Sequence, residues 1–147
     1  MPAQEFYYLA DPRLGVVDVV ALSEDELLVM ERGFEAGVGN TIRIYRVSLK
    51  EAKDISGVES LASSKAEPAQ KDLLVDLTDC PPSGAEPATG AVQANPLLDN
   101  FEAITRGPVL PDGRRSLVLV SDDNFSSTQT TRVIALALEK DLLKTGR

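Results

Sequence analysis

The stretch Val118-Leu-Val-Ser-Asp-Asp-Asn-Phe125 is the clearest indication of how this chain folds. A short apolar strand runs directly into three consecutive side chains that carry oxygen atoms. Two other stretches, Val29-Met-Glu-Arg-Gly-Phe34 and Leu98-Asp-Asn-Phe-Glu102, also place carboxylates beside an expected strand. Carboxylates clustered at strand ends are typical of β-rich proteins that bind hard cations or carry out acid–base chemistry. These stretches predict an all-β protein with acidic strand ends.

Short apolar runs separated by turn residues predict strands in both halves of the chain. Thr41–Val47 alternates apolar and polar residues strictly, which is typical of a half-exposed strand. The N-terminus is expected to enter a strand almost at once, and 31–40, which contains three glycines, is expected to be a loop. The other expected strands are 15–21, 27–30, 73–77, 101–105, 116–120 and 131–138.

The two halves repeat one order of elements. Leu27–Met30 corresponds to Leu117–Val120, and in both cases a carboxylate, a polar loop and an alternating strand follow. This order is typical of a propeller blade of about 40–50 residues, although two facing sheets of a sandwich give a similar pattern. Propellers close with four or more blades, and this chain supplies about two. We therefore expect a partial β-propeller of antiparallel strands with long polar loops.

Two polar segments interrupt the pattern. Lys50–Gln70 is expected to form a frayed helix or a loop, and Asp79–Pro96, rich in Pro, Gly, Ala and Thr, is expected to be a flexible surface loop. Neither looks like a domain boundary, so residues 1–147 are expected to form a single domain segment. Because open sheet edges invite strand addition, we expect a homodimer or a missing N-terminal half to complete the sheet.

The composition excludes several classes of function. With 15 basic and 23 acidic residues the net charge is −8, which argues against nucleic acid or an anionic membrane as a partner. No apolar run approaches the ~20 residues needed to cross a bilayer. The lone Cys80 cannot form a disulfide within the chain. Since the chain contains no histidine, it cannot contain a Ser–His–Asp triad or form a phosphohistidine, which leaves metal-assisted hydrolysis.

The acidic strand ends supply candidate metal ligands. Calcium takes six to eight oxygen ligands from carboxylates, amides and carbonyls. Because neighbouring residues of a strand point to opposite faces, Asp122 and Asp123 can bind one ion together only where the chain bends. Asp and Asn side chains also cap turns, so turn capping is the alternative for Asp123 and Asn124. The candidate ligands are Asp99, Asn100, Asp122, Asp123 and Asn124.

Carboxylates and arginines are the candidate groups for phosphoester chemistry. If the sheets fan around a central axis as propeller blades do, Glu31, Glu102 and Asp122 converge at one end of the central channel. A guanidinium matches phosphate with two parallel hydrogen bonds. The alternatives are an ordinary strand-edge role for Glu102 and ion pairs within Arg32–Glu31 or Arg132–Asp122. The candidates are Glu31, Glu102 and Asp122 as catalytic groups, and Arg32 and Arg106 as phosphate-binding groups.

Four motifs make the sequence similar to a known family. They are Glu31-Arg-Gly-Phe34, Thr41–Val47, Leu98-Asp-Asn-Phe-Glu102 and Leu110–Phe125. From about Phe6 to Leu138, with Lys50–Pro96 the weakest part, the chain resembles the C-terminal half of the phytase-like domain family, whose members are labelled "esterase-like activity of phytase". The resemblance implies a β-propeller from a mainly bacterial and often exported family. It therefore implies a secreted or periplasmic location and the absence of the family's N-terminal half.

Two functions follow as expectations. The first is hydrolysis of a small phosphorylated substrate, assisted by bound calcium, which makes the chain a phytase-like hydrolase. The second is a non-catalytic propeller module whose acidic clusters hold structural calcium or cap turns.

Overall fold

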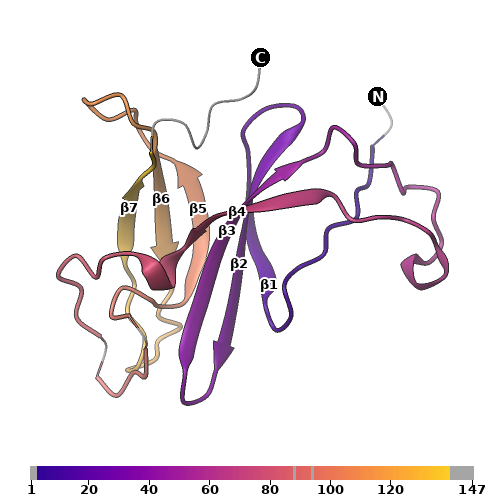
Figure 1. Cartoon of the computed structure of the whole chain (residues 1–147). Coiled ribbons are helices and arrows are strands. Elements are labelled where there is room, and N and C mark those ends of the chain that lie inside the picture. Colours follow the sequence, from indigo (N-terminus) through magenta and orange to yellow (C-terminus); the bar gives the residue numbers. More distant parts are fainter. Residues whose placement is uncertain (1–2, 88, 94, 140–147) are drawn as a thin grey trace.

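The computed structural model describes residues 3–87, 89–93 and 95–139, which form two antiparallel sheets (Figure 1). The first sheet contains β1 (Gly15–Ala21), β2 (Glu26–Glu35), β3 (Gly39–Ser48) and β4 (Gln70–Asp76). The second contains β5 (Phe101–Arg106), β6 (Ser116–Ser121) and β7 (Val133–Ala137). Two short 3-10 helices, η1 (Leu61–Ser63) and η2 (Leu77–Asp79), flank β4. The expected all-β fold is confirmed.

Within each sheet, strands that are neighbours in space also follow one another in the sequence. The first strands of the two sheets, β1 and β5, lie next to each other. There the carboxylate of Asp18 accepts a hydrogen bond from the backbone nitrogen of Ile104 at 2.7 Å. A β-bulge interrupts the register of β1 between Val16 and Asp18, as bulges do where a side chain is re-aimed. The uninterrupted strand order is that of propeller blades rather than a Greek-key sandwich, so the fold is consistent with a partial propeller.

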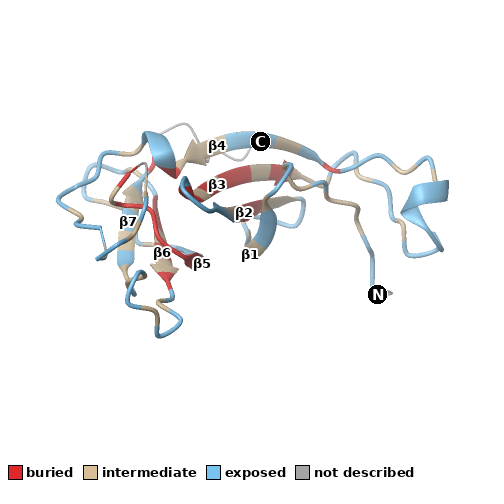
Figure 2. Cartoon of the chain, turned by 90° about the horizontal axis from the view of Figure 1, so that it is seen from below, coloured by how far each residue is buried: buried red, intermediate tan, exposed pale blue. Residues whose placement is uncertain are grey.

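The main core lies between the two sheets (Figure 2). Because side chains alternate across a strand, β2 presents Leu28 and Met30 to the second sheet and Val29 and Glu31 to the opposite face. Removing such large apolar groups from water contributes roughly 1.5–3 kcal/mol each to folding. Other fully buried members of this core are Ile42, Ile44, Leu77, Leu98, Phe101, Leu117 and Leu119.

The opposite face of the first sheet is partly covered by the N-terminal segment. Tyr8 packs against a small cluster that includes Val29 and Tyr45, and the backbone nitrogen of Ala69 donates to the carbonyl of Tyr7 at 2.7 Å. A Cβ at Gly33 would lie 2.5 Å from the carbonyl oxygen of Arg13, so β2 needs a glycine where this segment crosses it. The expected N-terminal strand is absent from the described residues, because this segment lies across the sheet instead of joining it.

The expected loop at 31–40 is also wrong. Strand β2 continues to Glu35 and β3 begins at Gly39, which leaves a tight turn. Gly37 and Gly39 have φ of 81° and 103°, so they serve this turn rather than a long loop. Between β3 and β4, η1 is the only helix among the described residues, and 80–100 contains no described helix or strand. In the described part, no helix is long and apolar enough to span a bilayer.

Candidate functional site

Glu31 and Arg32 are adjacent on β2, and their side chains therefore point to opposite faces of the first sheet. Glu31 is fully buried on the face covered by the N-terminal segment. Arg32 points toward the second sheet, where it meets Glu102 on β5. The structure thus brings Arg32 and Glu102 together and separates Glu31 from both.

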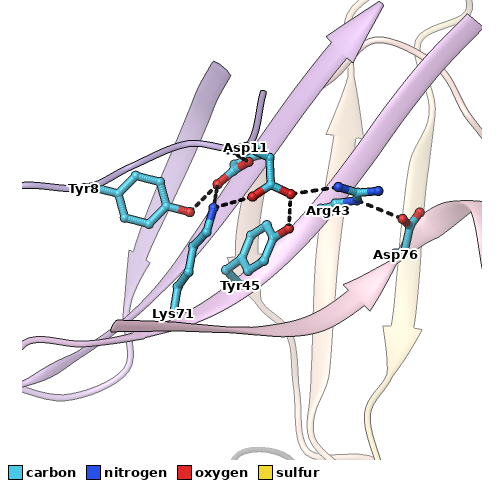
Figure 3. Close-up of polar contacts among 7 residues, drawn as sticks. Tyr8, Asp11, Arg43, Tyr45, Lys71 and Asp76 are labelled. Carbon is cyan, nitrogen blue, oxygen red and sulfur yellow. Dashed lines mark hydrogen bonds and ion pairs between the residues drawn. The ribbon is translucent and has the colours of Figure 1, made fainter. Parts of the chain in front are cut away.

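The Glu31 face carries a set of polar side chains that we call the acid–base network (Figure 3). Lys71 on β4 donates to Glu31 at 2.7 Å and to Asp11 at 2.8 Å. The second oxygen of Glu31 accepts from the backbone nitrogen of Asp11 at 2.9 Å, and its first also accepts from the Tyr8 hydroxyl. The members of the network are Tyr8, Asp11, Glu31, Arg43, Tyr45, Lys71 and Asp76.

Asp11 is the centre of this network. One of its oxygens accepts from Arg43 at 2.7 Å and from the Tyr45 hydroxyl at 2.5 Å, while the other accepts from Lys71. Arg43 also bonds Asp76 at 2.9 Å, which carries the network to the end of β4. The ammonium of Lys71 lies 4.1 Å from the centre of the Tyr45 ring, within the range of cation–π attraction.

These contacts shift the ionisation of the network. Hydrogen bonds from Lys71 and then Tyr45 lower the pKa of Asp11 to about 2. Burial, reinforced by the hydrogen bond to Glu31, raises the pKa of Tyr8 well above its ordinary value. Burial lowers the pKa of Lys71, but its hydrogen bonds to Asp11 and Glu31 outweigh burial and raise it. Asp11 and Lys71 therefore favour each other's charged forms, which is typical of a structural network rather than of a group ready to exchange protons.

The opposite face of β2 opens into a cavity of about 550 Å³ between the two sheets, which we call the Arg32 groove. Its walls are the β2–β3 turn, the segment Gly90–Gln93 and the loop that follows β6. Most of its polar lining consists of side-chain amides. Its polar lining includes Arg32, Asn40, Gln93, Asn100, Asn124 and Gln129.

Arg32 is held loosely in this groove. Its Nη1 donates to the Oδ1 of Asn40 at 3.3 Å, and its Nη2 lies 3.6 Å from the Oε1 of Glu102. The Nε atom is buried and has no hydrogen-bond partner among the described residues. The same Glu102 oxygen accepts from the side chain of buried Asn100 at 3.1 Å, which fixes the carboxylate beside the guanidinium. Arg32 thus brings unused hydrogen-bonding capacity to the groove lining, and the oriented carboxylate of Glu102 lies beside it.

Asp99 and Asn100 lie side by side but have structural partners. One Asp99 oxygen accepts from the nitrogen of Asn100 at 2.9 Å, and the other accepts from that of Thr130 at 3.0 Å. Asn100 donates its side-chain amide to the carbonyl of Asp122 at 3.0 Å as well as to Glu102. These bonds tie the start of β5 to the end of β6 and to the loop before β7.

Asp122, Asp123 and Asn124 follow β6, and the chain bends there. Asn124 and Phe125 have φ of 48° and 57°. The Oδ1 of Asp122 accepts from the nitrogen of Asn124 at 3.1 Å, and that of Asp123 accepts from the nitrogen of Phe125 at 2.8 Å. Both carboxylates therefore cap the turn in the structure. In the described ranges, no three acidic or cysteine side chains form a group suited to a metal ion.

The arginine pairs differ from the expected ones. Arg32 pairs with Glu102 rather than with Glu31. Arg132 lies 3.5 Å from Asp99 rather than pairing with Asp122. Arg106 is exposed at the end of β5, away from the lining of the Arg32 groove. Both observed pairs join segments that are far apart in the sequence. They could therefore not be predicted from neighbouring residues.

Sequence reasoning missed several polar residues that the fold gathers. Tyr8, Asp11 and Lys71 lie far from Glu31 in the sequence, and no motif joins them. Asn40 was assigned to a loop, although its side chain holds Arg32. For Asp11, no pattern in the sequence marks it as the centre of a network.

Comparison with known proteins identifies the family. A family model described as "Phytase-like: Esterase-like activity of phytase" matches residues 1–125. The match begins at the first residue and ends before β7, so it does not support assigning the chain to the C-terminal half of the domain. No curated protein and no solved structure matches the chain. Because the matched residues make up most of its length, the chain belongs to the phytase-like family.

Proposed function

We propose that this phytase-like chain binds a small phosphate ester in the Arg32 groove and takes part in its hydrolysis. The observation that carries the proposal is the Arg32 guanidinium, which is partly buried and whose Nε has no partner among the described residues. Its contacts to Asn40 and Glu102 are long, at 3.3 and 3.6 Å, and are therefore easily exchanged for phosphate oxygens. The groove volume of about 550 Å³ suits a small organic ligand.

The neighbouring residues suggest distinct roles. Arg32 would bind two phosphate oxygens with its planar fork of donors. Glu102 would accept a proton from the attacking water, because a carboxylate freed from the guanidinium by the ligand is an available base. Asn100 would keep that carboxylate in place through its 3.1 Å hydrogen bond. Asn40 and Asn124 would contact the organic part of the ester.

Replacing Arg32 with glutamine tests the proposal. We expect inorganic phosphate and phytate to bind the unaltered chain and to bind Arg32→Gln at least about tenfold more weakly, measured by calorimetry. The exposed Arg106→Gln variant is the matched control, because it removes the same charge outside the groove. Equal losses in both variants would indicate a general charge effect and contradict the proposal.

Hydrolysis needs a separate assay. We expect turnover of p-nitrophenyl phosphate, its bis-ester or phytate by the unaltered chain, and loss of turnover in Glu102→Gln with phosphate binding retained. No turnover of any of the three, with and without calcium, would leave a binding protein instead of an enzyme.

Calcium assistance stays a prediction. The described residues do not by themselves fit a calcium site, because Asp99, Asp122 and Asp123 already accept backbone hydrogen bonds and no group of three acidic side chains forms. A calcium ion would therefore need ligands from a further blade or a second copy of the chain. We expect removal of calcium with a chelator to change the melting temperature only if such ligands are present.

The second candidate function is a non-catalytic binding module. It is favoured by the carboxylates after β6, which cap their own turn, and by Glu31, which is locked in the acid–base network. This module would retain phosphate binding at Arg32 without turnover. In either case we propose that the two sheets belong to a longer propeller or pair with a second copy, and the molar mass in solution distinguishes these arrangements.

A further inference from the structure

The segment Gly90–Gln93, which we call the strap, lies beside the start of β3, beyond the point where β4 ends. Strand β4 pairs with β3 only from Arg43 to Ser48, whereas β3 begins at Gly39. The backbone nitrogen of Asn40 therefore lies beyond the end of β4, and it donates to the Oε1 of Gln93 at 2.9 Å. A side chain of the strap thus replaces a strand neighbour at the edge of the groove.

The strap also approaches the backbone of β3 closely at Gly39. A Cβ built on Gly39 would overlap the carbonyl oxygen of Val92 and the side chain of Gln93. This glycine is therefore required for two reasons, its φ of 103° and the contact with the strap. In the same turn, Gly37 has a similar φ of 81°, but its Cβ would meet no atom within 4 Å.

The chain on each side of the strap is anchored independently of it. Arg132 donates from Nη1 to the carbonyl of Pro96 at 2.6 Å and from Nη2 to the carbonyl of Glu86. Asn95 donates to the carbonyl of Cys80 at 2.6 Å. Between these anchors, a single hydrogen bond joins the strap to the β2–β3 hairpin in the part of the chain that the structure describes.

We propose that the strap is a displaceable wall that limits the size of the ligand in the Arg32 groove, an inference that rests on the proposed function. All four strap residues line the groove, and Asn40 contacts the strap through its backbone and Arg32 through its side chain. Moving the strap away would lengthen the groove while the anchors at Arg132 and Asn95 hold the rest of the segment. We expect a short phosphate ester to bind with the strap in place, and a bulky polyphosphate to bind more tightly once the strap has moved.

The two glycines of the turn provide the test. Gly39→Ala adds a methyl group that collides with the strap, and Gly37→Ala adds the same group with comparable backbone strain and no collision. We expect hydrogen exchange of the Asn40 backbone amide, which donates to Gln93, to become about tenfold faster in Gly39→Ala and to stay unchanged in Gly37→Ala. We also expect the ratio of phytate affinity to inorganic phosphate affinity to rise about fivefold or more in Gly39→Ala alone.

The possible results distinguish failure of the displaceable wall from failure of phosphate binding in the Arg32 groove. Equal exchange rates in the two glycine variants would overturn the displaceable wall. Faster exchange with an unchanged affinity ratio would overturn the size limit alone, while phosphate binding at Arg32 would stand. Failure of both probes to bind the unaltered chain would overturn the proposed function and the size limit with it. Gln93→Ala, which removes the hydrogen bond without adding strain, replaces Gly39→Ala if that variant does not fold.

Discussion

The two faces of the first sheet use charged residues in opposite ways. On one face, the buried Glu31 receives three hydrogen bonds, from Lys71, Tyr8 and the backbone of Asp11. On the other face, Arg32 has long contacts and an Nε without a partner among the described residues. A dense cluster of charges is therefore the part of this molecule least available for chemistry. Unused hydrogen-bonding capacity beside a cavity, rather than the number of charges, marks the candidate site.

The largest expected effect concerns Lys71. Lys71→Met leaves the carboxylates of Glu31 and Asp11 without their shared cation, one of them fully buried. Removing one partner of a buried ion pair costs about 3–5 kcal/mol, because the remaining charge loses its compensation. We expect a loss of this size in the free energy of unfolding, measured by urea denaturation. The exposed Lys53→Met is the control and should change stability by less than about 0.5 kcal/mol.

A loss in unfolding free energy below about 1 kcal/mol in Lys71→Met would contradict the contrast between the two faces of the first sheet. It would mean that water or a shifted side chain replaces the ammonium easily, and that the acid–base network is not closed. Glu31 would then regain its place as a candidate catalytic group.

Glu31 and Arg32 sharpen the comparison, because they are neighbours on one strand. Glu31→Gln keeps an acceptor for Tyr8 but removes the charge facing Lys71, so we expect a loss of about 1.5–3 kcal/mol in unfolding free energy and unchanged phosphate affinity. Arg32→Gln should lower stability by less than about 1 kcal/mol and abolish most phosphate binding. Urea denaturation and calorimetry on the same two proteins measure both quantities. Phosphate affinity that depends on Glu31 would show that the faces are coupled.

The pH dependence of stability tests the network without removing its cation. The pKa of Asp11 is about 2 in the folded chain, against about 3.9 when unfolded. Because the folded pKa is lowered, the contribution of Asp11 is complete above about pH 4 and is lost as the pH falls toward 2. The stability difference between the unaltered chain and Asp11→Asn should therefore shrink over this interval in urea denaturation. A constant difference would mean that the Asp11 contacts are not electrostatic.

At high pH the sign is reversed. The pKa values of Tyr8 and Lys71 are raised by folding, so their contributions are present below their unfolded values and are lost as the pH rises through the folded ones. Stability should therefore decline above about pH 10, and less so in Tyr8→Phe.

Much of the fold could be predicted from local sequence. The β-branched run Gly15–Ala21 and the alternating Thr41–Val47 lie in strands, because burial on one face imposes a period of two. The glycines of 31–40 misled the prediction, since Gly33 serves a crossing segment and Gly39 a contact with the strap. Both requirements come from residues distant in the sequence, which local patterns do not contain.

The candidate site was predicted only in part, for the same reason. The choice of Arg32, Glu102 and Asn100 as functional residues named three side chains that the fold brings together. The adjacent Glu31 was expected beside them, but strand alternation places it on the other face. Its partners come from the N-terminal segment and β4, and only the packing of that segment across the sheet reveals them.

The smallest expected effect decides between the two roles considered for the acidic turn after β6. Asp123→Ala removes the acceptor for the nitrogen of Phe125 and should cost about 0.5–1.5 kcal/mol, with the exposed Ser127→Ala as control. Asp123→Asn retains the acceptor and removes the charge, so under turn capping it restores the melting temperature. Under calcium binding the same variant loses any calcium-induced rise in melting temperature, because an amide is a weaker ligand than a carboxylate. Thermal melts of the two variants with calcium and with a chelator therefore separate the roles, and a calcium-induced rise that survives in Asp123→Ala would place the ion elsewhere.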